Sequence, residues 1–165
     1  KKGHFDKIQP TAEFPGIKIL SELPPTAEKR GSVFRLIGSF IEAYRASTEF
    51  VAINAFLPRK ENNIQLLQKL RHRIGLKYGL PTTLGFGPRY LHSTGQFHKG
   101  GPNTGLFILI TAQRDEDIPI PGQGVTFGIF QCAQAIGDKD ALLAKGRRVL
   151  MIDLESPDVS LLLKD

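Results

Sequence analysis

The 165-residue chain contains one cysteine, one methionine and no tryptophan. A single cysteine excludes both a disulfide-stapled scaffold and a metal site built from several cysteines. The longest apolar run, residues 106–110, is far shorter than the roughly 20 residues that span a bilayer. The first residues also lack the apolar core of a secretory signal. These absences predict a soluble cytoplasmic protein without a membrane partner.

The composition is that of an ordinary globular domain, but the positive charge is concentrated in one stretch. Hydrophobic residues make up 41% and charged residues 23% of the chain, and the net charge is +6. Residues 59–99 hold eight basic residues and one acidic residue, which leaves 14 basic and 15 acidic residues elsewhere. A local excess of positive charge attracts phosphorylated metabolites, nucleic acid or an acidic partner. The alternative is that half of these residues only form the solvated face of a helix. Nucleic acid is disfavoured because no recognised binding motif accompanies the charge.

Helix and strand signals alternate along residues 32–165, which we predict to be a single domain. Residues 1–31 are rich in proline and are predicted to be a linker or crossover with one short strand over 17–20. Buried strands are predicted over residues 50–57, 82–86, 105–111 and 147–154. Helices are predicted after Ser32, after Asn62 or Asn63 as far as Gly79, after Thr126 with an interruption at Gly137-Asp138, and briefly after Pro157.

This alternation predicts an α/β fold, a three-layer sandwich in which helices flank a mainly parallel sheet. In such folds ligands bind beyond the carboxyl ends of the strands. The loops after residues 57, 86 and 111 are therefore the expected places for a site.

The segment 89–102 follows the second predicted strand and is rich in donors and cations but has no carboxylate. Its chemically active residues are Arg89, His92, Ser93, Thr94, Gln96, His98 and Lys99. Such a set suits a sugar phosphate or another anion with many hydroxyl groups. A helix beginning near Ser93 would add to that preference. The order of a Walker loop is absent, and a metal site is disfavoured because no carboxylate or cysteine lies at ligand spacing from the two histidines.

Each of these residues also has a structural interpretation. His92 can be a hydrogen-bonded histidine at a strand–helix junction, and Ser93-Thr94 can cap a helix. His98 and Lys99 precede two glycines and can be mobile surface residues of a turn. Cys132, on an apolar helix face, is expected to be a small core residue rather than a nucleophile.

Several motifs then point to one family. The segments LHSTGQ (91–96), HKGGPNTG (98–105), DIPIPG (117–122), TFG (126–128), AQA (133–135), GD (137–138) and GRRVL (146–150) occur in this order. Together they resemble the C-terminal region of the bacterial fusion of transaldolase with glucose-6-phosphate isomerase. The resemblance covers residues 59–154 and continues more weakly upstream.

The resemblance implies the second of two Rossmann-like sugar-isomerase domains in a phosphoglucose isomerase. Such enzymes interconvert glucose 6-phosphate and fructose 6-phosphate by ring opening and enediol proton transfer, without a metal or an organic cofactor. The expected partners are the phosphosugar, the upstream sugar-isomerase and transaldolase domains, and a possible second copy of the chain. The family's glutamate base and its Ser/Thr-rich phosphate loop have no counterpart here, so both are expected upstream and the isolated chain is expected to be inactive.

The resemblance and the residue chemistry together assign roles to the predicted site. His92 is the expected catalytic residue, giving up or accepting a proton at the ring oxygen near neutral pH. The expected substrate-binding residues are Arg89, Ser93, Thr94, Gln96, His98, Lys99 and Gln131. Gln131 stands where the family carries a lysine. Three explanations remain open. The amide of Gln131 suffices to bind a substrate hydroxyl, or Lys99 or Arg89 supplies the positive charge in place of that lysine, or the isomerase activity is weakened.

We expect Arg89, His92, Gln96, His98 and Lys99 to line one groove at the carboxyl edge of the sheet. The alternative functions are a non-catalytic module that binds a phosphosugar, and a module that serves as an interface between domains or subunits.

Overall fold

A six-stranded sheet forms the centre of the protein in a computed structural model, which describes residues 8–28, 31–114 and 116–164. The strand order is β1-β2-β6-β5-β3-β4. Strands β3, β4, β5 and β6 are mutually parallel, while β1, β2 and β6 pair antiparallel. The bounds are β1 Ala12–Phe14, β2 Ile17–Ile19, β3 Phe50–Phe56, β4 Thr82–Phe86, β5 Gly105–Ala112 and β6 Arg148–Leu154.

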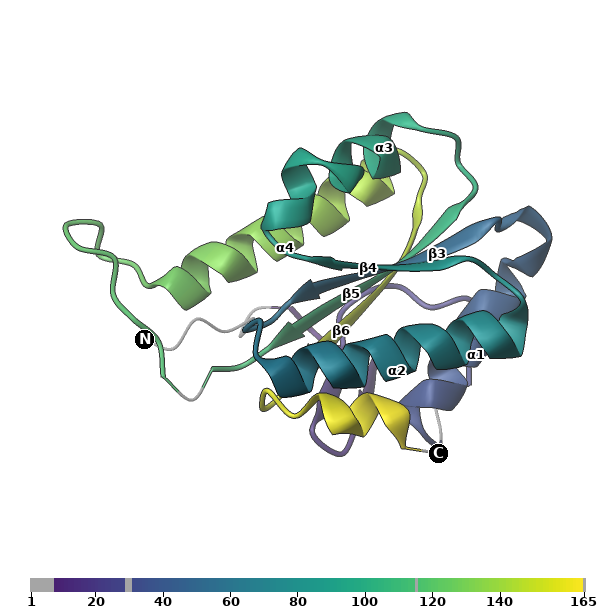
Figure 1. Cartoon of the computed structure of the whole chain (residues 1–165), viewed down its shortest axis with the longest axis horizontal. Coiled ribbons are helices and arrows are strands. Elements are labelled where there is room, and N and C mark those ends of the chain that lie inside the picture. The colour runs from purple at the N-terminus through teal and green to yellow at the C-terminus, as the bar shows by residue number, and fades with distance from the viewer. Residues whose placement is uncertain (1–7, 29–30, 115, 165) are drawn as a thin grey trace.

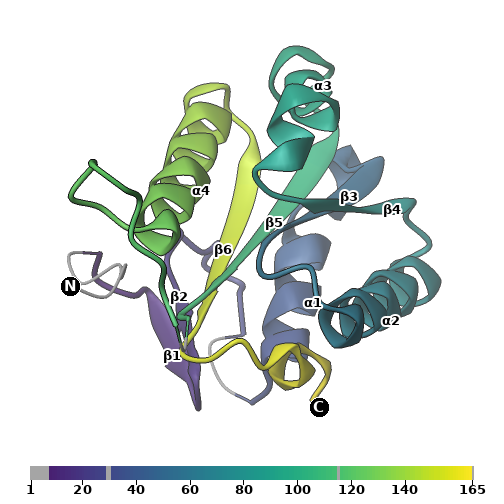
Figure 2. The same ribbon diagram turned by 60° about the vertical axis from the view of Figure 1, so that its left-hand side comes forward.

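Helices cover both faces of this sheet (Figures 1 and 2). The helices α1 Val33–Ala43 and α2 Glu61–Tyr78 lie on one face, and α3 Thr94–Gly100 and α4 Phe127–Ala144 lie on the other. Short 3₁₀ helices are η1 Arg45–Ser47, η2 Arg89–His92 and η3 Val159–Leu163. The predicted α/β three-layer sandwich with a mainly parallel sheet is thereby confirmed.

Alternate residues of the central strands supply two separate hydrophobic cores. Val51 and Ile53 of β3 pack into the core under α1 and α2. Their neighbours Ala52 and Phe56 pack into the core under α3 and α4. Because both faces are covered, the central strands are apolar on consecutive residues, which is the pattern that predicted them.

Local helix signals are largely borne out. The Ser32 hydroxyl accepts the N–H of Arg35 at 3.2 Å, and the Thr126 hydroxyl accepts the N–H of Ile129 at 3.2 Å. Gly79 ends α2 in the left-handed region at φ 61°. The start of α2 differs from the prediction, because Lys60 is its N-cap residue without a side-chain cap. Asn63 is buried inside the helix instead.

Helix α4 runs without the interruption expected at Gly137-Asp138. Gly137 is exposed, and the buried carboxylate of Asp138 accepts the hydroxyl of Tyr90. The short polar side chain therefore has a tertiary partner and does not compete with the helix backbone.

Part of the segment 1–31, predicted to be a linker or crossover, belongs to the sheet. Strands β1 and β2 form a hairpin around Gly16, whose φ of 75° suits the turn, and β2 pairs with β6 from Ile17↔Leu154 to Ile19↔Ile152. Ile17 and Ile19 are fully buried in the core under α1. Residues 1–7 and 29–30 of this segment lie outside the described residues. No helix of the described residues is long and apolar enough to cross a membrane.

Candidate functional site

Polar side chains gather at the carboxyl edge of the sheet, where the loop after β5 meets the first turns of α4. The guanidinium of Arg114, in that loop, donates a hydrogen bond to Oε1 of Gln131 on α4. The Nε2 group of Gln131 donates to the carbonyl of Gly87 at 3.2 Å, in the turn that follows β4. Gln131 thus joins two of the loops predicted to border a site.

Arg114 was not among the predicted site residues. A guanidinium carries five N–H donors in a planar fork, and the amide of Gln131 takes one of them. The side chain is half-buried, so its charge stays accessible at the sheet edge. The signal that could have found it is its position in the sequence, because Arg114 comes two residues after the end of a buried and largely apolar strand.

Asp117 holds the beginning of α4 in place. Its carboxylate accepts the hydroxyl of Thr126, and it accepts the backbone N–H of Gly128 at 2.7 Å. A Cβ at Gly128 would lie 2.5 Å from this carboxylate, so the glycine is required for the close approach. Asp117 therefore fixes the turn of α4 that carries Gln131.

A second polar group lies under α4 on the sheet itself. Thr111 of β5 donates its hydroxyl to Asp153 of β6 at 2.7 Å, and both residues are buried.

Burial, together with the charge of Asp153, raises the pKa of the Cys132 thiol to about 12. The thiol is thus protonated at neutral pH, in agreement with a packing role rather than a nucleophilic one.

The segment 89–102 does not form one groove at the carboxyl edge. It starts there as η2 and then runs back as α3 toward the opposite edge of the sheet. At that end Arg147, just before β6, donates to the carbonyls of His98 at 3.0 Å, Lys99 at 3.0 Å and Gly101 at 2.6 Å. The His98 side chain is buried and that of Lys99 is bound to Asp138, so the prediction that all five residues line one groove is wrong for these two.

His98 is a core residue rather than a mobile surface residue. Its side chain is 5% exposed, and its ring centre lies 4.9 Å from that of Phe107, 6.0 Å from Tyr90 and 6.4 Å from Phe50. Burial lowers the pKa of His98, so the ring is neutral at pH 7. The cause is the helical periodicity of α3, which turns positions 95 and 98 toward the sheet.

Lys99 is engaged with a carboxylate. Its Nζ lies 2.5 Å from Oδ1 of Asp138, a residue that is 4% exposed. The ammonium therefore neutralises a buried charge instead of replacing the lysine expected at position 131.

The other predicted residues of this segment are exposed: Arg89, His92, Ser93, Thr94 and Gln96. Gln96 donates to the carbonyl of Leu91 at 2.9 Å, while Ser93 is the N-cap residue of α3 without a side-chain cap. The side chain of His92 makes no hydrogen bond to another described residue. It stands at the end of η2, so the predicted catalytic imidazole is accessible to a ligand.

No group of three or more metal-ligating side chains is assembled within residues 8–28, 31–114 and 116–164. The carboxyl edge therefore offers, among these residues, one positioned guanidinium, an amide that bridges two loops, and an exposed imidazole. Such a set can bind an anion and exchange a proton.

No protein-family model matches the chain, and no curated protein matches it in sequence. Its structure is similar to the crystal structure of a hypothetical protein, TT0462, from Thermus thermophilus, with a TM-score of 0.63 and 19% sequence identity. The similarity covers 79% of this chain and 36% of that protein, so the chain spans about a third of its length. At this identity the likeness supports the α/β sandwich fold alone.

Proposed function

We propose that the chain is the second sugar-isomerase domain of a glucose-6-phosphate isomerase that is fused to transaldolase. The observation that carries the proposal is the Arg114–Gln131–Gly87 bridge, which holds a cation at the carboxyl edge of the sheet. That bridge meets the turn before η2, the element that ends at the exposed His92. The motifs that resemble the fusion family supply the substrate class.

Each residue has a defined task in this proposal. The guanidinium of Arg114 binds an anionic or hydroxyl-rich part of the phosphosugar, and Gln131 positions it. The imidazole of His92 gives up or accepts a proton at the ring oxygen, since its ordinary pKa is near neutrality. The segment 89–102 contains no glutamate, so the base that moves the proton between C2 and C1 is assigned to the other sugar-isomerase domain.

Exposed apolar side chains beside this edge support an interface there, which is the second candidate function. Ile118 is 68% exposed, Phe127 is 49% exposed and Phe130 is 53% exposed. Large apolar side chains that gather on a surface are typical of contacts between domains. Such a contact is compatible with catalysis, because the proposed site needs groups from a second domain.

The test is binding of fructose 6-phosphate to the chain, followed by backbone amide shifts. We expect shifts around residues 87–93, at Arg114 and at Gln131, with much weaker binding of fructose. Arg114→Gln should weaken binding about tenfold, the value of one charged hydrogen bond. Arg35→Gln, on the exposed surface of α1, removes the same charge from the opposite face and should have no effect.

A coupled assay separates binding from catalysis. The isolated chain should show negligible isomerase activity, while the complete polypeptide should be active. Equal binding by wild type and Arg114→Gln, or no activity in the complete polypeptide, would contradict the proposal.

A further inference from the structure

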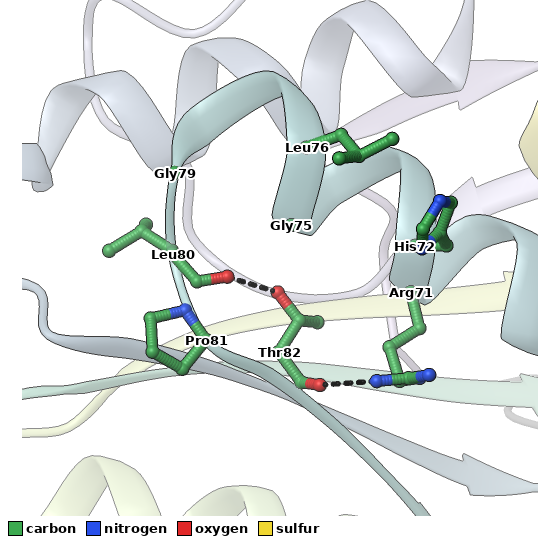
Figure 3. Close-up of a pocket in the computed structure, with 8 residues that line it drawn as sticks. All are labelled: Arg71, His72, Gly75, Leu76, Gly79, Leu80, Pro81 and Thr82. Carbon is green, nitrogen blue, oxygen red and sulfur yellow. Dashed lines mark hydrogen bonds between the residues drawn. The ribbon is translucent and has the colours of Figure 1, made fainter.

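A hollow of about 320 Å³ lies between the last turns of α2 and the beginning of β4 (Figure 3). The hollow lies at the amino ends of the strands, where β4 begins, whereas the candidate site lies at their carboxyl ends. Gly75 contributes no side chain to the lining, and a Cβ there would only make ordinary contact with the carbonyl oxygen of Leu80, at 3.5 Å. The hollow is lined by Arg71, His72, Gly75, Leu76, Gly79, Leu80, Pro81 and Thr82.

The rim of the hollow is cationic. Arg71 donates from Nε to Gln68 at 2.6 Å and from Nη1 to the carbonyl of Thr82 at 3.3 Å, which extends its guanidinium across the hollow (Figure 3). His72 is exposed beside it. Residues 62–78 of α2 contain four lysine or arginine residues and no acidic residue. The hollow therefore favours a negatively charged occupant.

Strand β4 borders the hollow and has an unpaired edge within the described part of the chain, where β3 is its one neighbour. The carbonyl of Pro81 accepts from Val51 of β3, and the N–H of Gly87 donates to Ala55 of β3. Because backbone groups alternate along a strand, those of Thr82, Leu84 and Phe86 point away from β3, and among these the carbonyl of Thr82 already accepts from Arg71. An edge of this kind can pair with a further strand.

We propose that this α2–β4 groove, the hollow together with the free edge of β4, binds an extended acidic segment of a partner protein. The segment adds a strand beside β4, its carboxylates meet Arg71 and His72, and its apolar side chains pack on Leu76. Leu76 is 73% exposed, so an apolar anchor is already at the surface. Main-chain pairing supplies affinity and the side-chain contacts supply specificity, as in other cases of strand addition.

A second copy of the chain fits this groove poorly. Antiparallel pairing of two β4 edges would bring two α2 helices side by side. Each helix presents the same basic surface, including Lys69, Arg71 and His72, and like charges in an interface cost free energy. An acidic partner gains from the same charges. The hollow and its charged groups lie at the amino ends of the strands, so their contacts with the acidic segment do not depend on the isomerase function, whose site lies at the carboxyl ends.

The first experiment uses a fluorescent eight-residue peptide that alternates glutamate with valine, and a matched peptide that alternates lysine with valine. Fluorescence anisotropy should show binding of the glutamate peptide that weakens as salt increases. Arg71→Gln should weaken it about tenfold. Lys145→Gln, which removes an exposed charge at the end of α4, should leave it unchanged. Equal binding of the two peptides, or equal loss in both variants, overturns the proposal.

Hydrogen exchange tests the geometry. The glutamate peptide should slow exchange at the amides of Leu84 and Phe86, which point outward, and leave Gly87 unchanged, since its amide is already bonded to β3. Peptide binding without this protection overturns strand addition. So does displacement of the peptide by inorganic phosphate at millimolar concentration, which indicates a site for small anions. Self-association in sedimentation together with no peptide binding assigns the edge to a second copy and also overturns the proposal.

Discussion

The hydroxyl of Tyr90 donates a hydrogen bond to the carboxylate of Asp138, and the pair joins η2 to the middle of α4 in the protein interior. Both side chains are 4% exposed. Lys99 also contacts this carboxylate, so Asp138 of α4 holds Tyr90 and Lys99, which lie on either side of His92 in the sequence. The position of the predicted catalytic imidazole therefore depends on a residue that lies outside its own segment.

The Tyr90–Asp138 pair predicts a loss of stability at alkaline pH. Burial, and then the charge of Asp138, raises the pKa of Tyr90, so the folded state keeps the phenolic proton above pH 10. The unfolded state releases that proton, and the free energy of unfolding should fall by about 1.4 kcal/mol per pH unit there. Urea unfolding between pH 8 and 11 measures this slope. Tyr90→Phe should remove it, whereas Tyr44→Phe should leave it intact.

His98 predicts a loss of stability on the acid side. Burial lowers its pKa, so the folded state holds a neutral ring while the unfolded state takes up a proton below pH ~6.5. The stabilisation is complete above that pH and is lost as the pH falls toward the lowered pKa. His98→Phe should flatten this dependence in urea titrations between pH 7 and 5. His92→Gln, which changes an exposed histidine, should keep the wild-type dependence; equal profiles for the two variants contradict the buried assignment.

Arg147→Lys tests the anchoring of α3. The guanidinium donates to three carbonyls at the end of this helix, and a lysine cannot reproduce that fork. We expect a loss of about 2 kcal/mol in the free energy of unfolding, measured by denaturation. Arg148→Lys is the matched neighbour, whose two exposed contacts are 3.3 Å long, and it should cost about 0.5 kcal/mol.

Cys132 should react slowly while the protein is folded. With a pKa of about 12, roughly one thiol in 10⁴ is ionised at pH 8, against about a quarter for an ordinary cysteine. Labelling with a chromogenic disulfide should therefore be at least 10³-fold slower in native buffer than in urea. A native rate within tenfold of the unfolded rate would show that the thiol is not held as described.

The catalytic assignment of His92 is tested in the complete polypeptide. His92→Gln should lower kcat for fructose 6-phosphate by roughly 10²-fold or more, the low end of general acid–base contributions. His98→Gln should have a smaller effect at equal folded fraction, because His98 is enclosed by aromatic rings at the other end of α3. Unchanged kcat in His92→Gln would return His92 to a structural role.

Signals that act over a few residues in the sequence predicted much of the fold. Ser32 and Thr126 cap helices through contacts three residues away, and Gly79 ends α2 through its own φ angle. The strands are consecutive apolar runs because both faces are covered, and that pattern needs no knowledge of the partners. The same reasoning predicted a short strand over residues 17–20, which is β2, but not β1 or the pairing of β2, because a strand of three residues carries little periodicity and β6 lies more than 130 residues later.

The candidate site shows the corresponding limit. Composition and motifs indicated that the segment 89–102 is chemically unusual. They did not indicate which of its side chains are exposed: the turns of α3 bury His98, while His92 lies at the surface. The contacts that decide this include Tyr90–Asp138, His98–Arg147 and Gly87–Gln131, and each joins residues more than 40 positions apart in the sequence. The sequence by itself determined which segments are helices and strands and that the sheet is mainly parallel, because those properties depend on local conformation and on burial. Only the tertiary structure decided which charges are neutralised inside, as with Lys99, and which remain at an edge, as with Arg114, because a charged group's state depends on the groups that folding brings to it.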